Sequence, residues 1–343
     1  MREVIPDIDK WLTEGKKVAI ATVVKVYGSA PRRLGSKMAV NQNSLMSGSV
    51  SGGCVENAVI EEALDALENG RSRLLSYGIT SDQAMNIGLA CGGTIEVFVE
   101  ALDPAEYARL RDDILHNRLV LRFTALTGKA CGSSFYAYRD GTHTPAFLPD
   151  ELRERLTAEL LQSLTTTRQT VRLADEDVEI LCEVFVPADK IIIVGAVHIA
   201  IPLVTFAREL GFRTIVLDPR RAFSNRERFP HADDLVVEWP QDALEGLGLD
   251  ESTYLVVISH DDKLDVPALA IGCKSNARYL GVLGSRKTFE KNVAGLLEEG
   301  VTKEQIARIH SPIGLKIAAR GAEEIALSII AEIIAVRNGL DSK

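Results

Sequence analysis

A single cysteine, Cys54, follows two glycines in residues 49–59 (SVSGGCVENAV). Apolar residues recur at helical spacing after the glycines, which predicts a helix from Cys54 to about Glu68. The first turn of a helix has unpaired N–H groups and the positive end of the helix dipole, so it attracts anions and favours loss of a thiol proton. We therefore predict that Gly52, Gly53 and Cys54 contact an anionic ligand that bears a metal or sulfur. The alternative is a structural cysteine buried at a helix start.

Two further groups of residues belong to this prediction. The loop GSAPRRLGSK carries Arg32, Arg33 and Lys37, and only a short predicted strand separates it from the cysteine segment. These cations either form a solvated loop or help to hold the same anion. Cys91 precedes Gly92, Gly93 and another predicted strand, and we expect this cysteine to face the first one across a turn.

The second half of the chain predicts a different architecture from the first. Its short apolar runs KIIIVGA, RTIVLDP, DDLVVEW, TYLVVIS and RYLGVLGS are typical of parallel strands that are buried on both faces. Helical segments lie between most of them, which predicts a Rossmann-like, doubly wound parallel sheet. The first half mixes helices with paired strands. We therefore predict an α/β protein with an α+β domain at residues 1–186 and a Rossmann-like domain at residues 187–343.

Ligands of a doubly wound sheet bind beyond the carboxyl ends of its strands. Glycine and polar residues follow four of the predicted strands, and we predict that they line one crevice: Gly195, His198, Asp218, His260, Asp261, Ser285 and Arg286. A structural hydrogen bond explains His198 as well as a ligand does. For His260, the neighbouring carboxylates favour a role in proton transfer or ligation.

The first turn of this domain resembles a dinucleotide fingerprint. Gly195 ends the first strand, and Asp218 ends the second, where a carboxylate could bond ribose hydroxyls. The middle glycine of the fingerprint is replaced by Val197, whose branched side chain obstructs the approach of a pyrophosphate. We therefore expect the Rossmann fold but doubt that the domain binds NAD(P).

Composition excludes several classes of protein. A formal net charge of −9 argues against a nucleic-acid binder and against docking on an anionic membrane. No apolar run is long enough to span a bilayer and the N-terminal residues do not resemble a secretory signal, so we expect a cytoplasmic protein. The five cysteines form no CxxC pair, which argues against a disulfide framework or a structural zinc site.

An apolar helix at residues 322–336 is expected to pack on the sheet or in a homodimer.

Motifs along nearly the whole chain resemble the xanthine dehydrogenase accessory factor family, XdhC/CoxI. The first half matches through GSAPRRLGSKMAV, GSVSGGCVE and GLACGGTIEVFVE, and the second half through IIIVGAVHIA, LDPR, SHD, GVLGSRKT, RIHSPIGL and AEEIALSIIAEI. Residues 104–185 contain no recognisable motif.

The resemblance implies a chaperone that binds the molybdenum cofactor, supports its sulfuration with a cysteine desulfurase and inserts it into a xanthine-dehydrogenase-like molybdenum hydroxylase. Such a protein is a maturation factor rather than a catalyst, with no catalytic residue of its own. The phosphate of the cofactor suits the glycine-rich turn and the basic loop, and its molybdenum suits a thiolate from Cys54 or Cys91. Two other classes stay open: an NAD(P)-dependent oxidoreductase with His260 as acid/base, and a nucleotide-sensing regulatory module.

Overall fold

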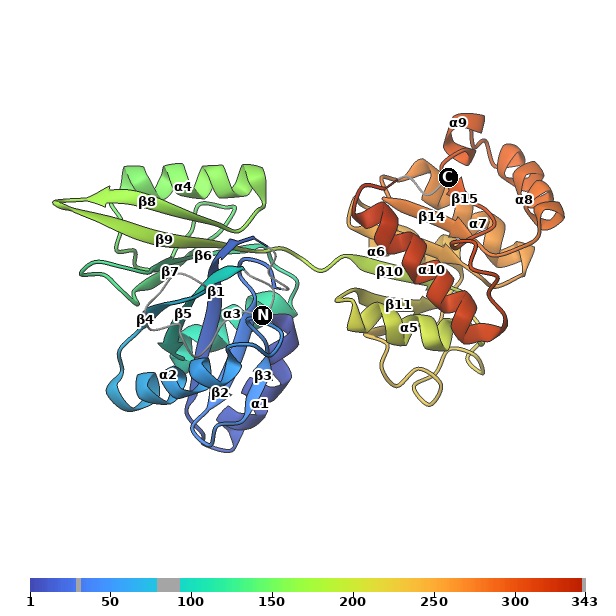
Figure 1. Cartoon of the computed structure of the whole chain (residues 1–343). Helices are drawn as coiled ribbons and strands as arrows, with labels where there is room; N and C mark the ends of the chain where they lie inside the picture. The colour runs from blue at the N-terminus through green and yellow to red at the C-terminus, as the bar shows by residue number, and fades with distance from the viewer. Residues whose placement is uncertain (29–31, 79–92, 341–343) are drawn as a thin grey trace. The chain divides into compact units, whose positions relative to one another are not determined.

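The structure is a computed structural model that describes residues 1–28, 32–78 and 93–340 of the 343-residue chain. The chain folds into two compact units, Met1–Pro187 and Ala188–Lys343 (Figure 1). Each unit has its own sheets and its own hydrophobic cores.

The first layer of the first unit is a five-stranded antiparallel sheet in the order β3-β2-β1-β5-β4. Helix α2 packs on one face of this sheet through Val59, Ala63 and Ala66. The central strand of this sheet, β1, is a nearly continuous apolar run, which agrees with the cover on both faces of the sheet. The elements are η1 (Arg2–Val4), α1 (Ile5–Thr13), β1 (Val18–Tyr27), β2 (Lys37–Asn41), β3 (Met46–Gly48), α2 (Glu56–Asn69), β4 (Arg73–Tyr77) and β5 (Thr94–Ala101).

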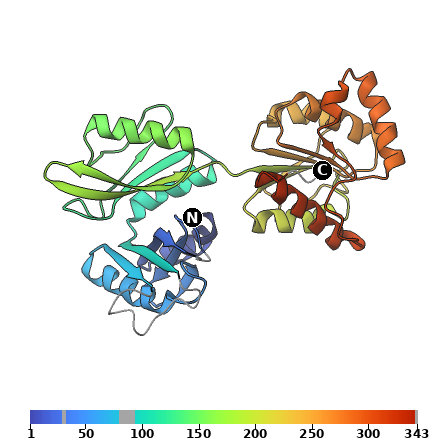
Figure 2. The ribbon, with the colours of Figure 1, turned by 45° about the horizontal axis from the view of Figure 1, so that its top comes forward.

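A second antiparallel sheet, in the order β7-β6-β9-β8, forms the other layer of this unit (Figure 2). Helix α4 covers it through Leu156 and Leu160, and the two sheets meet through Val24, Phe98 and Leu181. The mixed α+β architecture predicted for this half is confirmed. The elements are α3 (Pro104–Leu115), β6 (Val120–Ala125), β7 (Ser134–Ala137), α4 (Asp150–Ser163), β8 (Thr167–Leu173) and β9 (Glu176–Phe185).

The second unit is built on a six-stranded parallel sheet in the order β12-β11-β10-β13-β14-β15, which confirms the predicted Rossmann-like fold. Helices α5 and α10 cover one face, and α6, α7 and α8 cover the other. The elements are β10 (Lys190–Val194), α5 (Ala200–Glu209), β11 (Arg213–Leu217), β12 (Asp234–Val236), α6 (Pro240–Leu247), β13 (Thr253–Val257), α7 (Asp262–Lys274), β14 (Tyr279–Val282), α8 (Arg286–Glu298), α9 (Lys303–Ile306), β15 (Ile309–His310) and α10 (Gly321–Arg337).

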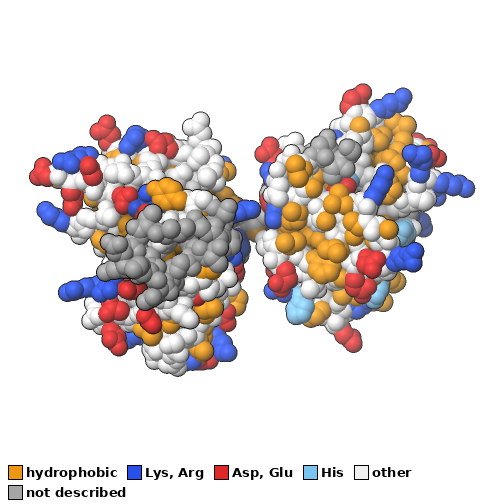
Figure 3. Space-filling model, viewed as in Figure 1, with side chains coloured by type: hydrophobic (Ala, Val, Ile, Leu, Met, Phe, Trp, Pro, Cys, Tyr) orange, Lys and Arg blue, Asp and Glu red, His pale blue; other side chains and the backbone are white. Residues whose placement is uncertain are grey.

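Helix α10 is apolar on most of its surface and packs on the sheet beside α5. Ala326, Ile329 and Ile333 are fully buried there, whereas Leu327 is 49% exposed. Hydrophobic side chains gather on the face of the second unit where α10 and α5 lie (Figure 3). The predicted packing of this helix on the sheet is therefore seen, and the homodimer stays a prediction.

Candidate functional site

Cys54 lies in a tight turn that immediately precedes helix α2. The helix begins at Glu56, two residues later than predicted, so the thiol is not in the first turn of the helix. The backbone N–H of Cys54 donates to the Ser51 hydroxyl at 2.9 Å, and the cysteine itself is exposed. An ordered backbone thus presents the thiol to solvent. The alternative of a buried structural cysteine is wrong.

The carboxylate of Glu56 organises this turn. It accepts hydrogen bonds of 2.5 to 3.2 Å from the side chains of Ser49 and Ser51 and from the backbone N–H groups of Val50, Ser51, Gly52, Gly53 and Val55. Burial alone would raise the pKa of Glu56, but these hydrogen bonds lower it to about 2. The turn is therefore built around an internal, ionised carboxylate.

This carboxylate occupies the position that we predicted for an external anion. The N–H groups of Gly52 and Gly53 donate to it at 3.1 and 2.9 Å, so they are not free to hold a phosphate. The prediction that these two glycines bind the anionic part of a ligand is therefore wrong. The group that this turn offers to a ligand is the thiol of Cys54.

Glu56→Gln is expected to destabilise the first unit by about 2 kcal/mol at neutral pH, because the amide nitrogen would face donors that now bond a carboxylate. The pKa of Glu56 lies below its usual value of 4.5, so its contribution is complete above that pH and fades as the pH falls toward 2. Urea unfolding at several pH values measures the difference. The exposed residue Glu61 of α2 supplies the control Glu61→Gln, which should change stability by less than about 0.5 kcal/mol. Equal stability of Glu56→Gln and the wild type at pH 7 would contradict this account.

Arg32 lies against the beginning of the cysteine turn. Its Nε donates to the carbonyl of Ser49 at 2.9 Å, and its Nη2 pairs with Glu3 at 2.5 Å. Arg32 thus ties the predicted basic loop to the turn and stays a candidate ligand contact. Arg33 is exposed on the same loop.

Lys37 does not belong to that basic loop. It is the first residue of β2, and its buried Nζ lies 2.6 Å from Glu183 and 2.9 Å from the Thr22 hydroxyl. Burial lowers the pKa of Lys37, and the charge of Glu183 opposes that change. The prediction that Lys37 helps a surface loop to hold an anion is wrong, because its charge is already paired inside the unit.

Cys91 and Gly92 lie outside the described residues. Their expected approach to Cys54 stays a prediction.

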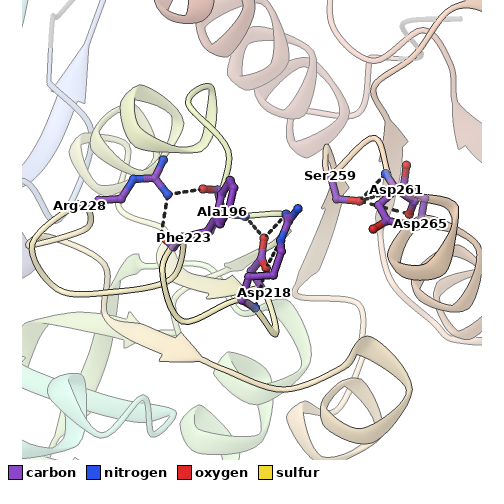
Figure 4. Close-up of polar contacts among 8 residues, drawn as sticks. Ala196, Asp218, Phe223, Arg228, Ser259, Asp261 and Asp265 are labelled. Carbon is purple, nitrogen blue, oxygen red and sulfur yellow. Dashed lines mark hydrogen bonds and ion pairs between the residues drawn. The ribbon is translucent and has the colours of Figure 1, made fainter.

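In the second unit, an internal ion pair lies beside the turn that follows β10 (Figure 4). Asp218 accepts a hydrogen bond from the N–H of Ala196 at 2.8 Å, and Arg220 bonds its two carboxylate oxygens at 2.8 and 2.7 Å. Burial alone would raise the pKa of Asp218, but these bonds lower it. Asp218 is fully buried, so the prediction that it bonds a ligand is wrong.

The loop after β11 folds over the same turn. Arg228 donates to the carbonyl groups of Ala196 and Phe223 at 2.8 and 2.7 Å, and its guanidinium stacks on the Phe223 ring (Figure 4). Gly195 has a φ of +106°, and a Cβ there would lie 2.6 Å from the Cα of Ser259. Its N–H donates to the carbonyl of Leu217. Packing of the strand ends thus accounts for Gly195 without a ligand.

A pocket of about 920 Å³ lies beside this turn at the carboxyl edge of the sheet. Three of the predicted residues line it: His260, Asp261 and Ser285. It also contains four basic side chains, and the first turns of α7 and α8 border it. The basic residues are Arg220, Lys263, Lys287 and Lys291. Two of these cations are already paired, Arg220 with Asp218 and Lys291 with Asp262, so the charges that remain for a ligand are those of the two other lysines. This combination of charge and helix starts favours an anionic group such as a phosphate.

A serine–aspartate pair supports the floor of this pocket. The Ser259 hydroxyl donates to Asp265 at 2.6 Å and accepts the N–H of Asp261 at 3.0 Å (Figure 4). Burial raises the pKa of Asp265 to about 6, and the hydrogen bond from Ser259 opposes this rise. His260 has a φ of +61°, and this backbone conformation places it at the exposed rim.

His198 and Arg286 are both exposed, in the turn before α5 and in the first turn of α8. They lie outside the residues that the structure places around the pocket, and their predicted contacts with a ligand stay predictions.

Sequence reasoning missed several pocket residues. Lys263, Lys287, Thr288 and Lys291 all lie in the first two turns of the helices that follow β13 and β14. The sequence contained a pattern that could have identified them. Basic and hydroxyl residues at the start of a helix that follows a parallel strand lie at the edge of the sheet where ligands bind.

The residues described carry no cluster of three His, Cys, Asp or Glu side chains that could hold a metal ion. Cys54 would therefore offer a single soft ligand to a metal that arrives with its own ligands. Across the same residues, no helix has the length and apolar character needed to cross a membrane.

Comparisons with known proteins agree on one family. The model described as the XdhC and CoxI family matches residues 11–78, which include the cysteine turn, and the XdhC Rossmann domain matches residues 191–333, which include the pocket. A Bacillus subtilis protein described as a probable xanthine dehydrogenase subunit is 29% identical, with 96% of each chain covered. The molybdenum cofactor insertion chaperone PaoD from Escherichia coli is also 29% identical, with 95% of this chain and 85% of PaoD covered.

A solved structure from Bacillus halodurans, described as a xanthine dehydrogenase, shares the fold with a TM-score of 0.80 and 24% identity. The match covers 98% of this chain and 96% of that one. The two family models together match more than half of the residues. On these matches, the chain belongs to the XdhC and CoxI family.

Proposed function

We propose that this protein binds the molybdenum cofactor as cargo and inserts it into a xanthine-dehydrogenase-like molybdenum hydroxylase. The observation that carries the proposal is the exposed Cys54 thiol on a turn that Glu56 holds rigid. A thiolate is a soft ligand that suits molybdenum, and an ordered turn lowers the entropy cost of binding. The relative named as a molybdenum cofactor insertion chaperone supports this choice of cargo.

The pocket of the second unit, taken by itself, has groups that suit the phosphate of the molybdenum cofactor. Lys263 and Lys287 lie at the starts of two helices, beside the Ser285 and Thr288 hydroxyls. These groups suit the phosphate of the cofactor. We also assign His260 and Asp261 of the lining to this binding role, and Arg286, which lies outside the lining, stays a predicted contact.

Sulfuration forms the finer part of the proposal. A cysteine desulfurase would deliver persulfide sulfur to the molybdenum while this chain holds the cofactor. A thiol reductant would supply two electrons, so that the sulfur enters as a sulfido ligand and the displaced oxo ligand leaves as water. The exposed position of Cys54 supports such a role, because a bound metal at this turn would stay accessible to a partner enzyme.

Co-expression with a molybdenum hydroxylase tests the function as a whole. The hydroxylase should contain at least tenfold more active molybdenum site when this chain is present than when it is absent, at equal amounts of folded apoenzyme. Full activity of the hydroxylase without this chain would contradict the proposal.

Reversing charge in the pocket gives a more specific prediction. The double variant Lys263→Glu/Lys287→Glu should weaken binding of the phosphate-bearing cofactor about tenfold or more, because two cations become anions beside the phosphate. Cofactor retained after gel filtration is the measurement. Lys303→Glu, on the exposed start of α9, is the matched control and should bind as the wild type does. If the double variant retains as much cofactor as the wild type, the pocket is not part of the binding site.

The oxidoreductase alternative predicts tight binding of NAD(P)H. Asp218 is buried against Arg220 and Ala196, so it is not free to bond ribose hydroxyls. Titration with NAD(H) and NADP(H) should therefore show no tight binding. Tight binding accompanied by hydride transfer would reverse the ranking of the two functions.

A further inference from the structure

Helix α10 has a second face, which the described residues of the second unit leave partly open (Figure 3). Glu324, Leu327, Ala331, Ile334 and Asn338 follow one another at alternating spacings of three and four residues, so they lie along one side of the helix. Leu327 is 49% exposed, and Ala331 and Ile334 are partly exposed. This alternation, with apolar residues at the centre, is the pattern by which one helix packs along another.

The face has an acidic end and a basic end. Glu323 and Glu324 are exposed in the first turn of α10, and Arg320, just before that turn, offsets one of the two negative charges. At the other end, Arg337 is the last residue of α10, and it donates to the carbonyl of Leu210 just after α5. The C-terminal ends of α5 and α10 therefore lie side by side.

The basic end keeps an excess of positive charge. Arg208, in the last turn of α5, and Arg337 are accompanied by one exposed carboxylate, that of Glu209. Asp189 also lies near Arg337, but Arg278 balances its charge. The face thus carries opposite excess charges at its two ends and apolar side chains between them. Such a face is complementary to itself when one copy is turned end for end.

We propose that this face binds a second copy of the chain, with the two α10 helices antiparallel about a two-fold axis. In this arrangement, Leu327 of each copy packs on Ala331 of the other, and Glu323 of each copy lies beside Arg337 of the other. The two contacts belong to one register of the helices, and the two-fold axis makes each of them twice. The small side chain of Ala331 leaves room for the leucine at the centre of the contact.

Sedimentation of the full chain over a wide range of concentrations tests this interface. The wild type should form a reversible dimer. Leu327→Glu should raise the dissociation constant of the dimer about tenfold or more, because it places a carboxylate of each copy in the apolar centre. Since Leu327 is half exposed, the variant should keep the thermal midpoint of the wild type.

Leu297→Glu is the matched control for this variant. Leu297 is 46% exposed on α8, which covers the opposite face of the sheet, so its replacement should leave the dimer unchanged. A wild-type chain that stays monomeric at every concentration would overturn the inference. Equal dimerisation by Leu327→Glu and the wild type, or an equal loss in both variants, would overturn it as well.

A charge exchange tests the antiparallel register. Glu323→Lys and Arg337→Glu should each raise the dissociation constant about threefold or more, and the variant with both changes should recover most of the loss. No recovery would overturn the register. If Arg337→Glu does not fold, because it loses its stacking on Phe212, cross-linking decides. An equal mixture of Leu327→Cys and Ala331→Cys chains should then form a disulfide between the two kinds of chain, and its absence would overturn the register.

The inference stands apart from the proposed function. A monomeric chain that carries the molybdenum cofactor would overturn only this interface. A dimer formed through α10 by a chain that never takes up the cofactor would contradict only the chaperone function.

Discussion

Cys54→Ala is expected to lower the activation of a co-expressed molybdenum hydroxylase at least tenfold. The thiol is exposed, and the turn that holds it is fixed by the Glu56 carboxylate and not by the thiol itself. Removal of the sulfur should therefore leave the fold intact while it removes the soft ligand to molybdenum. Hydroxylase activity per molecule of enzyme, with the amount of chaperone matched, is the measurement.

Cys131→Ala is the matched control for this loss. Cys131 is an exposed cysteine of the same unit, and burial raises the pKa of its thiol. Its removal should leave activation unchanged. An equal loss in both variants would show that the effect is a general one on the first unit, and full activation by Cys54→Ala would contradict the role of this thiol.

Lys37→Met is expected to destabilise the first unit by about 3–5 kcal/mol, which is the usual cost of leaving one partner of a buried ion pair without the other. The partner that loses its nearest counter-charge is Glu183, which is as deeply buried as the lysine and keeps only the more distant Arg122, at 3.7 Å. Chemical denaturation of the first unit measures this cost. If Lys37 instead bound the cargo on the surface, the variant would lose cargo and keep its stability.

The double variant Lys37→Met/Glu183→Leu provides the test of the cause. It removes both charges, so it should recover a large part of the stability lost in the single variant. Arg33→Met, which removes an exposed cation from the neighbouring loop, should change stability by less than about 0.5 kcal/mol. A double variant no more stable than Lys37→Met would show that packing, and not charge, causes the loss.

The fold of the second unit was predictable because its strands are buried on both faces. β10, β11 and β13 are nearly unbroken apolar runs, and helical segments lie between most of the strands of this unit, which together indicate a parallel sheet. β15 was not predictable, because a strand of two residues carries no periodicity. It forms only through its pairing with β14.

Two turns show where sequence reasoning fails: the cysteine turn, which we expected to bind an anion, and the turn after β10, whose neighbours we expected to line a ligand crevice. In both turns, backbone N–H groups bind an anion, but that anion is a carboxylate of the chain itself. Glu56 fills the turn before α2, and Asp218 bonds the turn after β10. Glycine-rich spacing predicts a set of free N–H groups, but it does not reveal whether a nearby acid already uses them.

Lys37 was misplaced for a related reason. Its neighbours in GSAPRRLGSK are basic and polar, so the local sequence favours a surface loop. Its partner, Glu183, is distant in the sequence and reaches it only because β9 packs over the first sheet. A contact of that kind depends on tertiary structure and leaves no local signal.

Cofactor content of the purified chain tests the central claim most directly. The full-length protein is isolated from cells that make the molybdenum cofactor, and molybdenum and pterin are quantified per chain. We expect the two in equal amounts and approaching one per wild-type chain, with Cys54→Ala retaining less than about one tenth as much. Wild-type protein that carries neither molybdenum nor pterin above the background of an unrelated protein would contradict the claim that this chain is a carrier of the molybdenum cofactor.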